Sequence, residues 1–173
     1  MLDHGLADLS LRPLAAAVGS SPRVLLYLFG SKDGLVAALL RRARMDELDL
    51  LDRVHERNQG RTAGLNVVAG QIWTWLAAPE HRALLALWVE AYGRSLVEPE
   101  GLWADFAQST VQDWLVVLAA AQPAADRNSE AGAVQRTLVL AVLRGALLDL
   151  LATGDEERVG AAVSRHLKGL SSD

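Results

Sequence analysis

The chain has 173 residues, enough for one compact domain or for a small module joined to a larger one. Alanine and leucine supply 60 residues and isoleucine one, a bias that favours helix and, with 51% apolar residues, argues against a disordered chain. The absence of cysteine excludes disulfides, thiolate nucleophiles and cysteine-ligated zinc. Residues 1–45 have a net charge of +3 and the rest −7, which indicates a polyanion partner for the N-terminal part unless the charges are simply scattered.

Near the N-terminus the sequence predicts two short helices joined by a glycine turn. Ser10 can cap the first helix, over 11–18, and Gly19 can end it in a left-handed conformation. Ser21 can cap the second helix, over 22–28. This arrangement is typical of a helix-turn-helix DNA-binding motif, although a generic helical hairpin shows the same apolar spacing. The side chains expected to pack between the two helices are Leu14, Val18, Leu25 and Leu28.

The rest of the chain is predicted to be helical, which makes the expected fold class all-α. A long helix opens at Lys32 or Asp33, after a break at Gly30, and reaches about residue 57. Later helices are expected over 62–77, 80–97, 100–121, 130–152 and 156–168, with proline or glycine in the gaps. No segment alternates apolar and polar residues as a strand would.

The N-terminal segment contains several short sequence motifs close to one another. It reads GLADLSLRPLA over 5–15, VG at 18–19, SPR at 21–23, FGSK at 29–32 and GL at 34–35. This wording closely resembles the DNA-binding head of TetR-family transcriptional regulators. The resemblance implies a helix-turn-helix head over 1–44, incomplete at its N-terminus, and a helical ligand-binding and dimerisation domain over 45–173. The run LLDLLATGD at 147–155 is similar to a phrase near the dimer-forming end of such proteins.

The resemblance implies that the helix after Ser21 is a recognition helix for the major groove. Arg23 could bridge guanine acceptors or a phosphate, and Val24 could touch a thymine methyl group. Lys32, at a helix N-terminus, suits a backbone phosphate. Ser21 could instead act only as a cap, and Tyr27 could instead pack at the helix end. The expected DNA-contacting residues are Ser10, Arg12, Ser21, Arg23, Val24, Tyr27 and Lys32.

Two features depart from the family pattern. Leu26 occupies a position where a tyrosine hydroxyl commonly touches phosphate, so we expect one contact fewer. The first helix of the family should precede Gly5, and only residues 1–4 stand there. We therefore expect either a further segment upstream of Met1 or a head that binds DNA weakly.

Seven of the nine aromatic residues fall between positions 73 and 114. Trp88 and Tyr92 are four residues apart, and Trp103 and Phe106 three, so each pair shares one helix face. The resemblance implies a cavity for a small, mostly apolar inducer among such rings, whereas filling of the core is the alternative. The expected pocket residues are Asn66, Gln71, Trp73, Trp88, Tyr92, Trp103 and Phe106, with Glu90 as a further polar group.

The segment 130–152 is apolar on nearly all sides, whereas a surface helix of a small monomer keeps a polar face. We expect it to be buried on two sides, one against its own chain and one against a second copy, in a four-helix interface with 156–168. A central core helix in a monomer is the alternative. The expected interface residues are Leu138, Val142, Leu143, Ala146, Leu150, Val159, Val163 and Leu167.

The function expected from these features is that of a ligand-responsive regulator, most simply a repressor, which binds a palindromic operator DNA as a homodimer and is released by a small hydrophobic ligand. The four histidines have no metal-ligand spacing and no nucleophile elbow is present, so we expect neither catalysis nor a cofactor. With no leader peptide and no membrane span, the expected location is the cytoplasm. The alternative is a helical dimer that binds a small molecule or a partner and whose head does not bind DNA.

Overall fold

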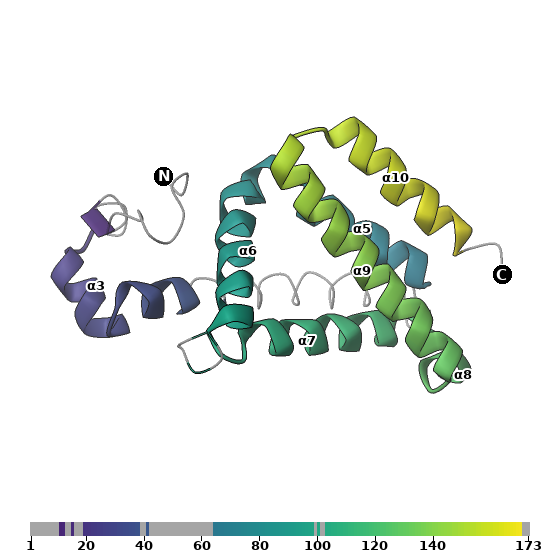
Figure 1. Cartoon of the computed structure of the whole chain (residues 1–173), viewed down its shortest axis with the longest axis horizontal. Helices are drawn as coiled ribbons and strands as arrows, with labels where there is room; N and C mark the ends of the chain where they lie inside the picture. The colour runs from purple at the N-terminus through teal and green to yellow at the C-terminus, as the bar shows by residue number, and fades with distance from the viewer. Residues whose placement is uncertain are drawn as a thin grey trace. The chain divides into compact units, whose positions relative to one another are not determined.

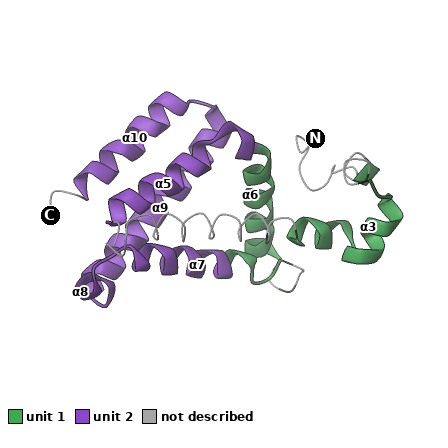
Figure 2. Cartoon of the chain, turned by 180° about the vertical axis from the view of Figure 1, so that it is seen from behind, with its two compact units in different colours: residues 1–49, 83–107 green, residues 50–82, 108–173 purple. Residues whose placement is uncertain are grey.

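The structure is a computed structural model that describes residues 11–12, 15, 19–38, 41, 64–98, 100 and 103–170. Within these ranges every regular element is helical and no strand is present, as the composition predicts. None of the helices in this part of the chain has the length and apolar character that crossing a membrane requires. Two compact units, coloured separately in Figure 2, divide the chain. Unit 1 comprises Met1–Asp49 and Ala83–Ala107, and unit 2 comprises Leu50–Arg82 and Gln108–Asp173.

The predicted glycine turn is present in unit 1. Residues 11, 12 and 15 are helical, and Gly19 adopts φ 64°, in the left-handed region that favours glycine. The Ser20 amide donates to the Ala15 carbonyl oxygen at 2.8 Å, which closes the C-terminus of this first helix. Ser10, Leu14 and Val18, which the sequence assigns to the same helix, lie outside the described residues.

Two serines cap the helices that follow this turn. Helix α3 spans Pro22–Phe29, and the Val24 amide donates to Ser21 Oγ at 3.3 Å, which confirms the predicted cap. Residues 32–38 and 41 are helical, and the rest of the helix predicted to reach about residue 57 lies outside the described residues. The Gly34 amide donates to Ser31 Oγ at 3.0 Å. Ser31, which was not predicted as a cap, therefore caps this second helix.

The helix over 32–38 joins two hydrophobic clusters of unit 1. Leu35 is buried with Ala15 and Leu25 of α3. The next two residues, Val36 and Ala37, are buried against a second cluster: Leu87, Ala91 and Trp103, with Leu84, Trp88 and Phe106 packed around it. Because neighbouring residues on a helix point about 100° apart, one helix can contact α3 with one side and this second cluster with another.

Helix α6 spans Arg82–Val97, and α7 spans Phe106–Ala120, starting later than the predicted residue 100. A side chain of α6 sets that start, because Ser95 Oγ donates to the Ala104 carbonyl oxygen at 3.1 Å and accepts from the Ala107 amide at 3.0 Å. Residues 103–105 form a turn before α7. The hydroxyl of Ser95 thus serves as the cap that the local sequence does not supply.

Unit 2 is built on three helices that pack pairwise: α5 (Leu65–Ala77), α9 (Glu130–Thr153) and α10 (Glu156–Gly169) (Figure 1). Each contributes apolar side chains at helical spacing, which confirms the predicted elements in this region. The buried ones are Leu65, Ala69, Ile72 and Leu76 of α5, Val139, Leu140, Leu143, Leu147 and Leu150 of α9, and Val159, Val163 and Leu167 of α10.

Two short elements of unit 2 were not predicted, the 3-10 turn η1 (Pro79–His81) and α8 (Ala124–Arg127). A polar network holds α8 between α7 and α9. Gln122 is 1% exposed, and its Nε2 donates to the Gly132 carbonyl oxygen at 3.0 Å. The Arg127 guanidinium donates to the carbonyl oxygens of Ala119 and Ala120, so it satisfies the C-terminal end of α7.

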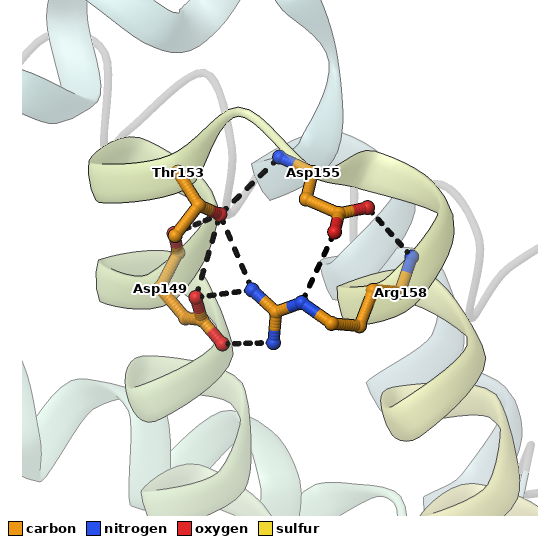
Figure 3. Close-up of polar contacts among 4 residues, drawn as sticks. All are labelled: Asp149, Thr153, Asp155 and Arg158. Atoms are coloured by element: carbon orange, nitrogen blue, oxygen red, sulfur yellow. Dashed lines mark hydrogen bonds and ion pairs between the residues drawn. The ribbon is translucent and has the colours of Figure 1, made fainter.

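The joint between α9 and α10 is held by one arginine (Figure 3). Gly154 ends α9 at φ 68°, and Asp155 caps α10 by accepting from the Arg158 amide at 3.0 Å. The Arg158 guanidinium donates to both carboxylate oxygens of Asp149, at 2.7 and 2.8 Å, and to Asp155 at 3.1 Å. This two-point pair fixes how α10 turns back on α9.

The Asp149–Arg158 pair predicts a specific pH dependence. The hydrogen bonds from Arg158 lower the pKa of the Asp149 carboxyl below its ordinary value. A lowered folded-state pKa stabilises the fold above the unfolded-state value, about 4, and this stabilisation is lost as pH falls through the folded-state pKa. We expect Asp149→Asn to lower the urea midpoint at pH 7 and to match the original chain progressively as pH falls towards 2. In a chain that already carries Arg158→Ala, Asp149→Asn should no longer change how the urea midpoint depends on pH. If Asp149→Asn had the same effect with and without Arg158, this account would be contradicted.

Candidate functional site

The exposed face of α3 is the first candidate surface. Leu25, 7% exposed, faces the core as predicted, whereas Val24 and Tyr27 are 45% and 86% exposed. Arg23 is exposed, and so is Arg12 of the preceding helix. The sequence of α3, PRVLLYLF, contains no acidic residue. This face can therefore offer a cation, a phenol and an apolar contact to a polyanion.

One prediction for α3 is wrong. Leu28, expected to pack inward beside Leu25, is 64% exposed. It lies in the last turn of α3, and the buried cluster of Ala15, Leu25 and Leu35 does not include it. Leu26 and Phe29 are also exposed, at 40% and 38%, so α3 is apolar on its outer side to an extent that the sequence did not predict.

The N-terminus of the 32–38 helix carries mixed charge. Lys32 is half-buried there, and the neighbouring Asp33 carboxylate lies 3.9 Å from Arg94 of α6. Arg94 also donates to Glu90 at 3.1 Å, one turn earlier on α6. A phosphate at this helix end would meet Lys32 and the helix dipole, while the Asp33 charge that opposes it is partly offset by Arg94.

The aromatic residues of unit 1 form one cluster. The rings of Trp88 and Tyr92 have centroids 5.1 Å apart, those of Trp88 and Phe106 6.4 Å, and those of Trp103 and Phe106 5.6 Å at 89°. Trp103 is 2% exposed, and the other three rings are half-buried. Both predicted pairs are therefore in contact, although Trp103 lies in the turn before α7 and does not share a helix face with Phe106 as predicted. Four of the expected pocket residues lie together.

The other three expected pocket residues, Asn66, Gln71 and Trp73, belong to α5 and so to unit 2. Gln71 Oε1 is buried with no hydrogen-bond donor among the residues the structure describes. Near the end of α5, the rings of Trp75 and His81 stack at 4.2 Å, and His81 Nδ1 lies 2.8 Å from the Trp75 carbonyl oxygen. His81 has no metal-ligand spacing in the sequence, and this contact, which joins residues six positions apart, was not predicted.

Most of the expected interface residues point into their own chain. Leu143, Leu150, Val159, Val163 and Leu167 are buried in unit 2, so they build its core rather than an outer surface. Val142 and Ala146 are half-buried, and Leu138 is 52% exposed. Only Leu138 of this set is directly available to another molecule.

A different stripe of α9 is exposed and apolar. We call it the α9 seam; its members follow one another at alternating intervals of four and three residues: Val134, Leu138, Ala141, Gly145, Leu148 and Ala152. Val134, Leu138 and Leu148 are 63%, 52% and 51% exposed. An alternation of four and three residues, which repeats every seven, is the pattern by which helices pair in coiled coils. Helix α9 is therefore apolar on two sides, one buried in unit 2 and one exposed.

The compact units group the chain differently from the predicted division at residue 44, because Ala83–Ala107 clusters with the N-terminal residues. The aromatic cluster thus lies in the same unit as α3. No protein-family model, curated protein or solved structure matches this chain.

Proposed function

We propose that this protein is a ligand-responsive transcriptional regulator of the TetR type, which represses by binding a palindromic operator as a homodimer. The observation that carries the proposal is the exposed face of α3, where Arg23 and Tyr27 follow a tight left-handed turn at Gly19. A short, capped helix with this exposed face and no acidic side chain suits the major groove of DNA.

The α9 seam supports the homodimer. A second copy related by a two-fold axis would bring the same seam opposite, and the small Ala141 and Gly145 between larger residues would let the two helices approach closely. Two copies would present two α3 helices to two half-sites of a palindrome.

The aromatic cluster of unit 1 supports release by a small, mostly apolar inducer. Half-buried rings around a buried indole resemble the lining of small-molecule sites in general, in which aromatic walls surround a few polar atoms. The cluster also includes Val36 and Ala37, whose helix contacts Leu25 of α3 through Leu35.

The test is DNA binding to the region that flanks the protein's own coding sequence, measured by gel shift at several salt concentrations. We expect Arg23→Ala to weaken binding about tenfold to a hundredfold, because a base or phosphate contact is lost. Arg165→Ala removes the same charge from the exposed side of α10 and should leave the affinity unchanged. Affinity should also fall steeply as salt rises.

The same gel shift tests the dimer. Two chains per operator are expected, and Leu138→Glu should abolish this complex, whereas Val116→Glu, on the exposed side of α7, should not. Binding that is insensitive to salt, or that responds equally to Arg23→Ala and Arg165→Ala, would contradict the proposal. A dimer that does not bind DNA would favour the alternative function, a helical dimer that binds a small molecule or a partner and whose head does not bind DNA.

A further inference from the structure

The indole of Trp103 is a buried donor without an acceptor. Its side chain is 2% exposed, and no acceptor lies within hydrogen-bonding distance of Nε1 in the described part of the chain. Buried polar groups in proteins are nearly always hydrogen-bonded, and one left unpaired costs free energy that an acceptor would restore. An incoming molecule with an acceptor atom would therefore gain affinity at this position.

The surroundings of Trp103 suit an aromatic molecule. Phe106 meets it edge to face, and Trp88 and Tyr92 continue the cluster. These three rings are half-buried, whereas Trp103 lies deeper. The aliphatic neighbours Leu84 and Leu87 complete an apolar surrounding. Aromatic rings pack edge to face or offset against one another, which favours a flat guest over a branched aliphatic one.

Arg94 of α6 does not favour an anionic guest. Arg94, on the same helix as Trp88, is already paired with Glu90 and Asp33. A carboxylate placed beside Trp103 would lose its hydration and receive one neutral N–H in return, which is unfavourable. A carbonyl oxygen needs only one donor to be satisfied.

We propose that the aromatic cluster of unit 1 binds a neutral aromatic carbonyl compound, whose oxygen accepts a hydrogen bond from Trp103 Nε1 and whose ring packs among Trp88, Tyr92 and Phe106. This inference rests on the proposed ligand-responsive function and gives the inducer its chemical class. Ligand binding here would act on Val36 and Ala37, which share the cluster with Trp103.

Three matched probes test the inference: 2-acetylnaphthalene, its alkene isostere 2-isopropenylnaphthalene, and 2-naphthoate. In nitrogen-15 spectra of the whole chain, the indole N–H signal of Trp103, identified by its absence in Trp103→Phe, should move downfield with the ketone and not with the alkene. Trp103→Phe should lower the affinity for the ketone about three- to tenfold and leave the affinity for the alkene unchanged. Trp114→Phe, a half-buried indole of α7 in unit 2, should alter neither.

Equal binding of ketone and alkene, tighter binding of the naphthoate, or no binding of any probe would overturn the inference. If Trp103→Phe does not fold, the Trp103 signal is assigned in the unsubstituted chain by elimination, from the signals that disappear when each of the other four tryptophans is replaced by phenylalanine. That signal then either responds to the ketone alone or does not. Operator binding is measured separately. If the chain prefers the ketone to the alkene but does not bind DNA, the proposed regulator function is overturned and the ligand site stands. If it binds DNA but does not prefer the ketone, only the proposed ligand site is overturned.

Discussion

Replacing Gly132 with alanine should destabilise unit 2 by about 2–3 kcal/mol, although alanine is the better helix former. Gly132 lies in the first turn of α9, where a Cβ would overlap the carbonyl oxygen of Asp126 in α8. That neighbour is backbone, so it cannot rotate aside as a side chain could. Chemical denaturation monitored by circular dichroism measures the change.

The same glycine is held through both of its backbone polar groups, which is why the chain cannot simply shift. Its amide donates to Ser129 Oγ at 2.9 Å, and its carbonyl oxygen accepts from Gln122 Nε2 at 3.0 Å. Moving Gly132 away from Asp126 would stretch these two hydrogen bonds, each of which contributes about 1 kcal/mol.

Gly160→Ala in α10 is the matched control. A Cβ at Gly160 would approach Trp73 Nε1 at 4.0 Å, an ordinary contact, so this substitution should stabilise the chain by about 0.5–1 kcal/mol. The two glycine substitutions should thus have opposite signs in the same unit. If Gly132→Ala were also stabilising, the close approach of α8 to α9 would not exist in solution.

The sequence predicted those elements whose signals are local. Gly19 and Ser21 act within four residues of their partners, and both the turn and the cap are present as expected. The helices of unit 2 follow from apolar spacing along each segment, and α9 ends at Gly154 as the glycine indicated. Such features depend on the order of neighbouring residues, which a sequence shows directly.

The features that sequence reasoning missed depend on contacts between distant segments. The start of α7 depends on Ser95, twelve residues before the Ala107 amide it accepts from. Helix α8 depends on Arg127 and on the buried Gln122, whose partners lie ten to fourteen residues further along. No local pattern marks a glutamine as buried, because glutamine is usually a surface residue.

For the same reason, the sequence did not show which side chains of the candidate surfaces face the core. Because α9 is apolar on two sides, the sequence could not show that Leu143 faces the core while Leu148 is exposed. In α3 the pattern allowed both Leu25 and Leu28 to face inward, and only the first does. Pairing of Trp88 with Tyr92 was predictable from their spacing on one helix, whereas the burial of Trp103 without an acceptor was not.

Gln122→Leu should destabilise unit 2 by about 2 kcal/mol, because leucine fills a similar volume but can neither donate nor accept. The Gln122 amide makes three hydrogen bonds to α9: besides the bond to Gly132, its Nε2 donates to Gln135 Oε1 at 3.2 Å, and its Oε1 accepts from Arg136 at 3.1 Å. Arg136 in turn donates to the Arg127 carbonyl oxygen at 3.2 Å. Losing the amide would leave polar groups buried at this corner with fewer partners than they need.

Gln112→Leu, the same substitution on the exposed side of α7, is the control and should change the free energy of unfolding by less than about 0.5 kcal/mol. Equal effects of the two substitutions would mean that Gln122 contributes only as a solvated side chain. A larger loss at Gln122, together with faster amide hydrogen exchange at Gly132 and Gln135, would show that one buried amide holds α8 and the start of α9 in place. Hydrogen bonds would then determine how α8 lies against the start of α9, whereas apolar burial stabilises the packing of α5, α9 and α10.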